Sequence, residues 1–158
     1  MPKPKDYPGV PPDTQVPGSL TFQKTKGLVG LRQISLRWKW TPGPSCRHPE
    51  EPCSTIKNRE HHPVVYSAYE DAKSYSAWAG KVLPSEADWE FATHGGFDGA
   101  IFLLGDDHFP NNQPAANIWQ GDFLWQKLEL DGFIGTSPVG SFPANGYELY
   151  DTAENVGK

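Results

Sequence analysis

Two glycine-rich loops of this 158-residue chain carry the residues best suited to binding a metal ion, through side-chain and backbone oxygens. Asn117 and Ile118 lie in "NIWQGDF", and Asp131 and Phe133 lie in "DGF". A hard cation such as Ca²⁺ takes carboxylates, side-chain amides and backbone carbonyls as ligands, and both loops offer them. Asp131 would supply the charge. Asn and Asp in such loops also form ordinary turns, so the spacing alone leaves both interpretations open.

The other reactive side chains form weaker patterns. None of the five histidines stands at the i, i+4 spacing of a helical zinc pair. Cys46 and Cys53, in "CRHPEEPC", fit a disulfide, a weak metal pair or two unrelated thiols, and a reducing compartment favours free thiols. Glu86, Asp88 and Glu90 fit a capped, solvated helix face better than a catalytic group. The six tryptophans fit core packing better than a ligand platform.

Charge and hydropathy exclude two classes of partner. The formal net charge is -5, and no run of lysine or arginine is long enough to follow a nucleic-acid backbone. No apolar stretch approaches the roughly 20 residues that cross a bilayer, and the N-terminus lacks the apolar segment of a signal peptide. We therefore expect no nucleic acid, no membrane, and a cytoplasmic location.

The elements that must position these residues are short and separated by loops. Residues 1–17 are rich in proline and predict a mobile arm, and residues 18–158 predict one domain. Apolar residues alternate near 20–22 and 38–40, which is typical of short strands. The fold class is therefore expected to be α+β and rich in loops.

Two helices are expected between residues 67 and 96. Ser67 and Glu70 form a capping-box pattern for the first, and Gly80 ends it. Ser85 can cap the second by pairing with Asp88, and Gly95-Gly96 ends it. The residues of the second helix expected to face the core are Ala87, Trp89 and Phe91.

The order of several motifs resembles the formylglycine-generating enzyme family, also called the sulfatase-modifying factor domain. The stretches that carry the resemblance are "VPGSLTF", "RWKWTPGPSCRHPEEPCSTI", "HHPVVYSAYEDAKSYSAWAGKVLPSEADWEFATHGG", "NIWQGDF", "DGFIGTSPVGSFPANGYELYD" and "ENV". The resemblance implies a fold related to C-type lectins, with bound calcium. It also implies oxidation, by O₂ and copper(I), of a cysteine in a Cys-x-Pro-x-Arg segment of an unfolded sulfatase.

The resemblance also assigns calcium ligands. The first family site matches the Asn117 side chain, the Ile118 carbonyl, the Asp131 carboxylate and the Phe133 carbonyl. The second family site falls on residues 151–158, where the match is incomplete. Its candidate ligands are Asp151, Glu154, which replaces a glycine, and Val156; Lys158 stands where the family has a glutamate. An ammonium group repels a cation, so we expect this second site to be degraded.

The copper ligands of the family are two cysteines that lie beyond the matched motifs. Cys46 occupies a place where the family pattern has tryptophan, and Cys53 lies outside the matching motif as well. We therefore expect a domain that is incomplete at its C-terminus, without catalytic residues and marginally stable by itself. The alternatives are an enzyme completed by a missing part, a non-catalytic calcium-stabilised lectin-like binding module, and a degenerate gene fragment.

Overall fold

The computed structural model describes residues 9, 11, 16–30, 32–50, 53–102, 105–107, 109, 113–123, 125–153 and 155–156. The predicted arm at residues 1–17 falls mostly outside these ranges, and so does Glu154. The chain divides into two compact units, one mainly of residues 1–60 and one mainly of residues 67–121 and 127–158. The expected α+β class is confirmed by a two-stranded sheet and two α-helices.

The first unit is built on an antiparallel strand pair. Strand β1 (Gly18–Phe22) pairs with β2 (Trp38–Pro42), and the 3₁₀ helix η3 (Ile34–Leu36) precedes β2. The hydroxyls of Thr21 and Thr41 are 2.7 Å apart across the strands, and the rings of Phe22 and Trp38 meet edge to face at 5.7 Å. The alternation of apolar residues therefore predicted both strands correctly.

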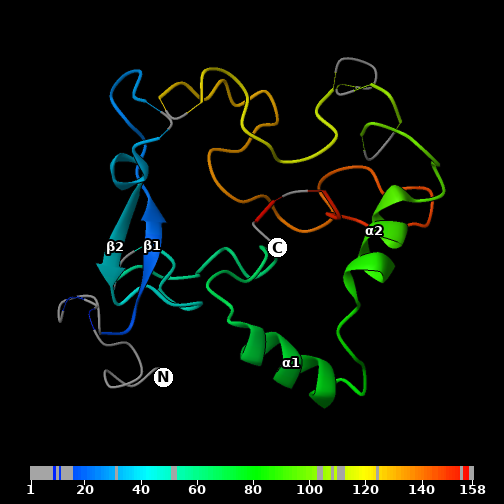
Figure 1. Cartoon of the computed structure of the whole chain (residues 1–158), viewed down its shortest axis with the longest axis horizontal. Coiled ribbons are helices and arrows are strands. Elements are labelled where there is room, and N and C mark those ends of the chain that lie inside the picture. The colour runs from blue at the N-terminus through cyan, green and yellow to red at the C-terminus, as the bar shows by residue number, and fades with distance from the viewer. Residues whose placement is uncertain are drawn as a thin grey trace. The chain divides into compact units, whose positions relative to one another are not determined.

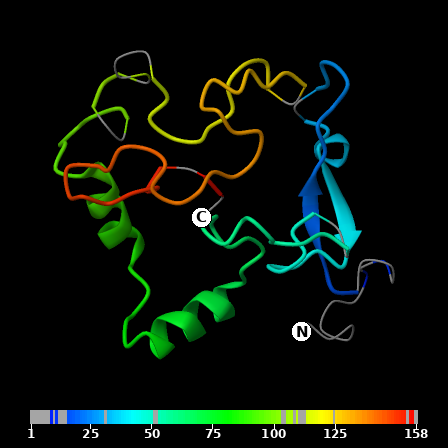
Figure 2. The same ribbon diagram turned by 180° about the vertical axis from the view of Figure 1, so that it is seen from behind.

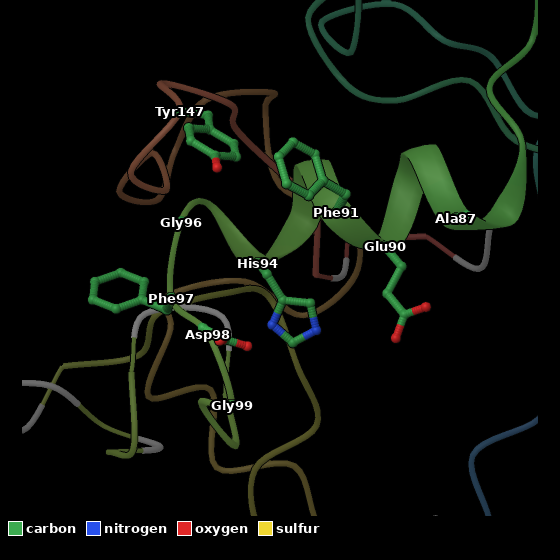
Figure 3. A pocket seen from close by; sticks show the side chains of 9 residues that line it. All are labelled: Ala87, Glu90, Phe91, His94, Gly96, Phe97, Asp98, Gly99 and Tyr147. Atoms are coloured by element: carbon green, nitrogen blue, oxygen red, sulfur yellow. The ribbon is translucent and has the colours of Figure 1, made fainter.

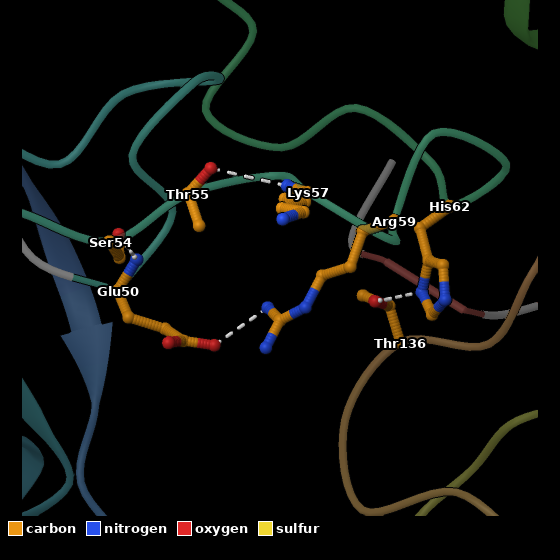
Figure 4. Close-up of polar contacts among 7 residues, drawn as sticks. All are labelled: Glu50, Ser54, Thr55, Lys57, Arg59, His62 and Thr136. Carbon is orange, nitrogen blue, oxygen red and sulfur yellow. Dashed lines mark hydrogen bonds and ion pairs between the residues drawn. The ribbon is translucent and has the colours of Figure 1, made fainter.

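A polar loop follows β2 within the same unit. Glu50 and Arg59 form an ion pair at 2.6 Å, the Glu50 N–H donates to Ser54 Oγ, and the Lys57 N–H donates to Thr55 Oγ1 (Figure 4). Both charged side chains are exposed, so solvent screening leaves this ion pair little effect on stability.

The second unit contains both helices. Helix α1 (Tyr69–Trp78) begins where the Ala68 N–H donates to Asp71 Oδ2 at 3.0 Å. The predicted Ser67 and Glu70 cap is therefore wrong by one residue, although Gly80 follows the helix at φ +67° as expected. The error arose because Ser is a common cap, whereas here the acidic side chain at the third position supplies the acceptor.

Helix α2 (Glu86–His94) has the predicted cap. Ser85 Oγ accepts from the Asp88 N–H at 3.2 Å, and Asp88 Oδ2 accepts from the Ser85 N–H at 3.1 Å and from its hydroxyl at 2.6 Å. These hydrogen bonds from Ser85 hold the pKa of Asp88 below its ordinary value. At the other end Gly95 takes a left-handed conformation, with φ +59°.

The helices do not provide the buried core that the sequence predicted. Neither helix, all of whose residues are described, contains a buried residue. Trp89 and Phe91 are exposed, and so is Ala87, so the prediction that these three face a core is wrong. The Tyr147 ring packs against Phe91 but leaves it 69% exposed.

Buried side chains of the second unit are instead polar and come from its loops. Ser137 and Asn145 are 0% and 5% exposed, and Asn117 and Gln120 are also buried. Buried polar groups need hydrogen-bond partners. Asn117 and Asn145 have partners in other segments, whereas Ser137 Oγ and Gln120 Oε1 have none among the described residues. Among the described residues no helix is both long and apolar enough to cross a membrane.

Asn145 is the clearest example, because it fastens a distant loop to the end of α2. Its Nδ2 donates to the carbonyls of Ala92 (2.7 Å) and Thr93 (3.1 Å), while its Oδ1 accepts from the N–H groups of Tyr147 (3.0 Å) and Leu149 (3.1 Å). In both cartoon views the loop of residues 137–153 accordingly lies beside α2 (Figures 1 and 2). The Asn145 amide thus provides hydrogen-bond partners both for carbonyls at the C-terminal end of α2 and for N–H groups of the loop.

We predict that Ser85→Ala raises the pKa of Asp88 toward its ordinary value. Because folding lowers this pKa, the contribution of Asp88 to stability is present above the unfolded-state pKa and is lost as pH falls through the folded-state pKa. Ser85→Ala should reduce that acid-side loss, because only the Ser85 N–H then remains to donate to the carboxylate, and it should weaken the start of the helix. Titration of the Asp88 carboxyl followed by NMR measures its pKa. Ser74→Ala in α1 is the control. An unchanged Asp88 titration would contradict this account of the cap.

We predict that Asn145→Ala destabilises the second unit by about 3 kcal/mol, because it leaves two loop N–H groups and two helix carbonyls without their partner. Urea unfolding measures the free energy of unfolding. Gln113→Ala, which removes an exposed amide, is the control and should change it by less than about 0.5 kcal/mol. Equal stabilities of the two variants would show that the Asn145 hydrogen bonds contribute nothing net.

Candidate functional site

The first predicted ligand, Asn117, is a buried side chain at a junction of three loops. Its Nδ2 donates to the Gly135 carbonyl at 2.7 Å and to Asn155 Oδ1 at 3.3 Å. Within the described residues no group donates to Asn117 Oδ1. The nitrogen side of the amide is therefore committed to structure, and the oxygen side is available to a ligand.

Gln120 lies beside the second predicted ligand, the carbonyl of Ile118. The Gln120 Nε2 donates to that carbonyl at 2.7 Å, and the side chain is only 4% exposed. Its Oε1 is buried and has no hydrogen-bond partner among the residues described. Gln120 is not among the residues predicted from the sequence, yet its buried amide adds another oxygen near the predicted ligand, the Ile118 carbonyl.

Asp131 is the charged member of the set. Its Oδ1 accepts from the Phe133 N–H at 3.0 Å, which is the Asx turn that the alternative interpretation of the sequence allowed. Its Oδ2 is buried, and no described residue donates to it. A turn explains one carboxylate oxygen only. Leaving the other oxygen buried and unpaired is costly, and a cation would remove that cost.

Two hydrogen bonds hold the two loops of the predicted site against each other. The Leu128 N–H donates to the Gln120 carbonyl at 2.9 Å, and Asn117 reaches Gly135, two residues beyond Phe133. The ring of Phe133 packs against Phe142 with centroids 6.1 Å apart. The structure thus brings the four residues predicted from separate motifs into one region of the second unit. Their oxygens are of the kinds that a hard cation prefers.

The second predicted site is only partly described. Asp151 has a left-handed backbone, with φ +53°, and its Oδ2 accepts from the Gly140 N–H at 2.7 Å. Val156 is half-buried, and Glu154 lies outside the described residues. Asp151 therefore already fastens the loop around Gly140.

Asn155 is a structural residue that sequence reasoning did not single out. Its Oδ1 accepts from the Ser137 N–H at 2.8 Å, and its Nδ2 donates to the Ser137 carbonyl at 3.0 Å. Through Asn117 the same side chain also meets the first predicted site. Its φ of +128°, rare for a residue other than glycine, marks it as held by this network. The only signal in the sequence was an asparagine within a loop, which does not identify its partners.

The cysteines and histidines do not form a metal centre in the part of the chain that is described. Cys46 and Cys53 are free, exposed thiols. His62 Nδ1 is 2.8 Å from Thr136 Oγ1, a structural hydrogen bond within the second unit (Figure 4). No group of three or more His, Cys, Asp or Glu side chains converges among the described residues.

Comparison with known proteins gives a consistent picture. The Sulfatase-modifying factor enzyme 1-like domain family matches residues 14–158. A formylglycine-generating enzyme of Mycobacterium tuberculosis is 46% identical over 150 residues, which cover 95% of this chain and 50% of that protein. The Bos taurus formylglycine-generating enzyme is 47% identical over 146 residues, covering 91% and 39%. The Bos taurus protein named Inactive C-alpha-formylglycine-generating enzyme 2 is 43% identical over 140 residues, covering 87% and 45%.

The chain thus spans half, or less, of the length of these curated relatives. Identities of 43–47% extend over most of its own length. The chain belongs to the sulfatase-modifying factor, or formylglycine-generating enzyme, family.

Proposed function

We propose that these 158 residues form a calcium-bound part of a domain of the formylglycine-generating type. The reaction of such a domain is the oxidation of a cysteine in a Cys-x-Pro-x-Arg segment of an unfolded sulfatase to formylglycine. The support is 46% identity to a formylglycine-generating enzyme over 95% of the chain. The fold relationship to C-type lectins is part of this proposal, as is a cytoplasmic location.

The calcium ion would be held by Asn117 Oδ1, the carbonyls of Ile118 and Phe133, and Asp131. The observation that carries this assignment is the buried Oδ2 of Asp131, which no described residue satisfies. The set fits Ca²⁺ by chemistry, because it combines one carboxylate with neutral oxygens and contains no thiolate or imidazole. Bound there, the ion would neutralise Asp131 and link the loops that carry the four ligands.

The second site, at Asp151, Glu154 and Val156, would bind calcium weakly or not at all. Asp151 Oδ2 is engaged with the Gly140 N–H, and Lys158 places a positive charge in the ligand segment.

Copper does not fit the residues present. Copper(I) prefers soft thiolate ligands, and the two cysteines of the chain are exposed and lie outside the motif that carries the copper ligands of the family. Oxidation therefore requires residues other than these 158. The contribution of this chain is to shape and brace the domain, and through it to position an unfolded sulfatase peptide.

A non-catalytic binding module is the second candidate function. It is favoured by the 43% identity to a relative named Inactive C-alpha-formylglycine-generating enzyme 2, over 87% of this chain. In that case the chain would bind a polypeptide without oxidising it, and calcium would have the same bracing role.

We predict that calcium raises the melting temperature of the chain and that Asp131→Asn abolishes the rise. Calcium at about 100 times its Kd should stabilise the parent by about 2.7 kcal/mol, or roughly 5–10 °C. The amide oxygen introduced by Asp131→Asn can still accept from the Phe133 N–H, so only the charge is removed. Calorimetry with calcium or with chelator measures the shift, and Asp122→Asn, an exposed carboxylate, is the matched control. An Asp131→Asn protein that responds to calcium like the parent would contradict the assignment.

We predict that the 158-residue chain, supplied with copper(I), O₂ and a Cys-x-Pro-x-Arg peptide, forms no formylglycine above the protein-free background. Mass spectrometry of the peptide measures the product. Formylglycine formed by the chain would contradict the absence of catalytic residues. This conclusion would hold whether the Cys46→Ser/Cys53→Ser double variant keeps the activity or loses it. Fluorescence anisotropy of the same peptide separates the two candidate functions, because binding without turnover is the behaviour expected of a binding module.

A further inference from the structure

Asn145 is the only asparagine of the chain that is followed by a glycine. In an Asn-Gly pair the backbone nitrogen of the glycine can attack the side-chain amide of the asparagine, because no Cβ on the second residue shields that nitrogen. Asparagine is accordingly among the thermolabile residues of proteins. Asn145 and Gly146 contact residues 92–95 at the end of α2, and we call this contact the α2–loop junction.

The junction needs both residues of this reactive pair. The Asn145 amide donates to the carbonyls of Ala92 and Thr93 and accepts from two loop N–H groups, so it needs both a donor and an acceptor. Gly146 is needed because a Cβ atom there would clash with the carbonyl oxygen of Gly95. The contacts that close the junction thus select an asparagine followed by a glycine.

The closed junction keeps the pair from reacting. Attack requires the Asn145 carboxamide to turn toward the Gly146 nitrogen, but four hydrogen bonds of 2.7 to 3.1 Å fix that carboxamide. The backbone has no room to adjust, since a Cβ on Gly95 would lie 2.7 Å from the Gly146 nitrogen and 2.8 Å from Asn145 Cγ. Asn145 is also only 5% exposed, which keeps water from the carboxamide. Reaction therefore requires the junction to open.

We propose that Asn145 is a site of spontaneous covalent modification, converted to aspartate or isoaspartate when the α2–loop junction opens. The Gly146 nitrogen loses its proton and bonds to Asn145 Cγ, the Cγ–Nδ2 bond breaks, and ammonia leaves. Water then opens the resulting succinimide at either of its two carbonyls, which gives aspartate or isoaspartate. The reaction consumes one water molecule and needs no oxidant or reductant. It depends neither on calcium at Asp131 nor on sulfatase oxidation.

Neither product restores the closed junction. An aspartate has no N–H to donate, so its carboxylate would face the Ala92 and Thr93 carbonyls without a hydrogen bond. These carbonyls lie at the C-terminal end of α2, where the macrodipole disfavours a negative charge. An isoaspartate lengthens the backbone by a methylene group and displaces Gly146 from Gly95. Each modified chain thus keeps its loop released from α2.

Release of the loop would also open a pocket at the C-terminal end of α2. The pocket has a volume of about 470 Å³, and Figure 3 shows Phe91 and Tyr147 side by side in its lining. Their ring centroids are 5.5 Å apart, and a Cβ atom at Gly96 would lie 3.5 Å from Tyr147 Cε1. Because Asn145 joins the Tyr147 segment to α2, its modification would free this wall of the pocket.

The test follows the full 158-residue chain at neutral pH by mass spectrometry of its proteolytic fragments, with a synthetic peptide of residues 141–150 as the unfolded reference. Because a slow reaction follows the equilibrium population of the open form, the folded chain should react at least about ten-fold more slowly than the peptide. In urea above the unfolding midpoint the two rates should agree. Isoaspartate should appear beside aspartate. Reaction of the folded chain at the peptide rate, or product without isoaspartate, would overturn the inference.

Two glycine variants separate the junction from strain elsewhere. Gly95→Ala places a Cβ against the reactive pair and should speed deamidation several-fold toward the peptide rate. Gly80→Ala puts an alanine at the same left-handed position after α1, where a Cβ would meet nothing within 4 Å, and should leave the rate unchanged. Equal rates in the two variants would overturn the inference. Should Gly95→Ala unfold the second unit, the urea series of the parent chain decides.

The released loop is tested on the modified chains themselves. Ion exchange separates them by their added negative charge, and NMR then measures nuclear Overhauser effects between the rings of Phe91 and Tyr147. We expect these effects to be lost, both in the modified chains and in Asn145→Asp, whereas those between Tyr75 and Trp78 in α1 remain. Modified chains that keep the Phe91–Tyr147 effects would contradict the opening of the junction.

Discussion

The second unit of this protein depends on side-chain amides that replace the missing backbone pairing of its loops. Asn145 joins the end of α2 to the loop at 147–149, and Asn155 joins Ser137 to Asn117. Each amide has donors and an acceptor, so one residue can satisfy groups from two segments at once. Loops without strands or helices would otherwise bury backbone groups without partners. The same network holds the proposed calcium ligands near each other and fixes Tyr147 in the wall of the α2 pocket.

Sequence reasoning succeeded where the signal is local. The Ser85–Asp88 cap, the end of α2 at Gly95 and the two strands β1 and β2 all follow from residue types within a few positions, and each is present. The α1 cap was misplaced by one residue because the actual N-cap is Ala68, a residue type that gives no capping signal, and Asp71 supplies the acceptor. The core prediction failed for a different reason. Helical periodicity identifies which face is apolar, but burial of Phe91 depends on a covering segment, which no periodic pattern of the helix itself encodes.

The residues of the candidate site show the same contrast between local signals and contacts distant in the chain. Asn117 and Asp131 were found through their motifs, whereas the contributions of Gln120 and Asn155 depend on contacts between loops distant in the chain. Nothing in the local sequence separates an asparagine that ends a turn from one that bridges three segments. The unsatisfied Oδ2 of Asp131 is likewise a property of the fold, and it makes the cation interpretation stronger than a turn alone. Among the described residues, the side-chain amides link segments of the second unit, and the two cysteines are free, exposed thiols.

Hydrogen exchange of individual backbone amides tests the central role of these side-chain amides most directly. The N–H groups of Ser137, Tyr147 and Leu149 lie outside any helix or strand, yet each donates to an asparagine Oδ1. In the calcium-loaded 158-residue chain they should exchange orders of magnitude more slowly than unstructured amides, as do amides in stable cooperative units. Exchange of all three at the rate of an unfolded chain would contradict the account.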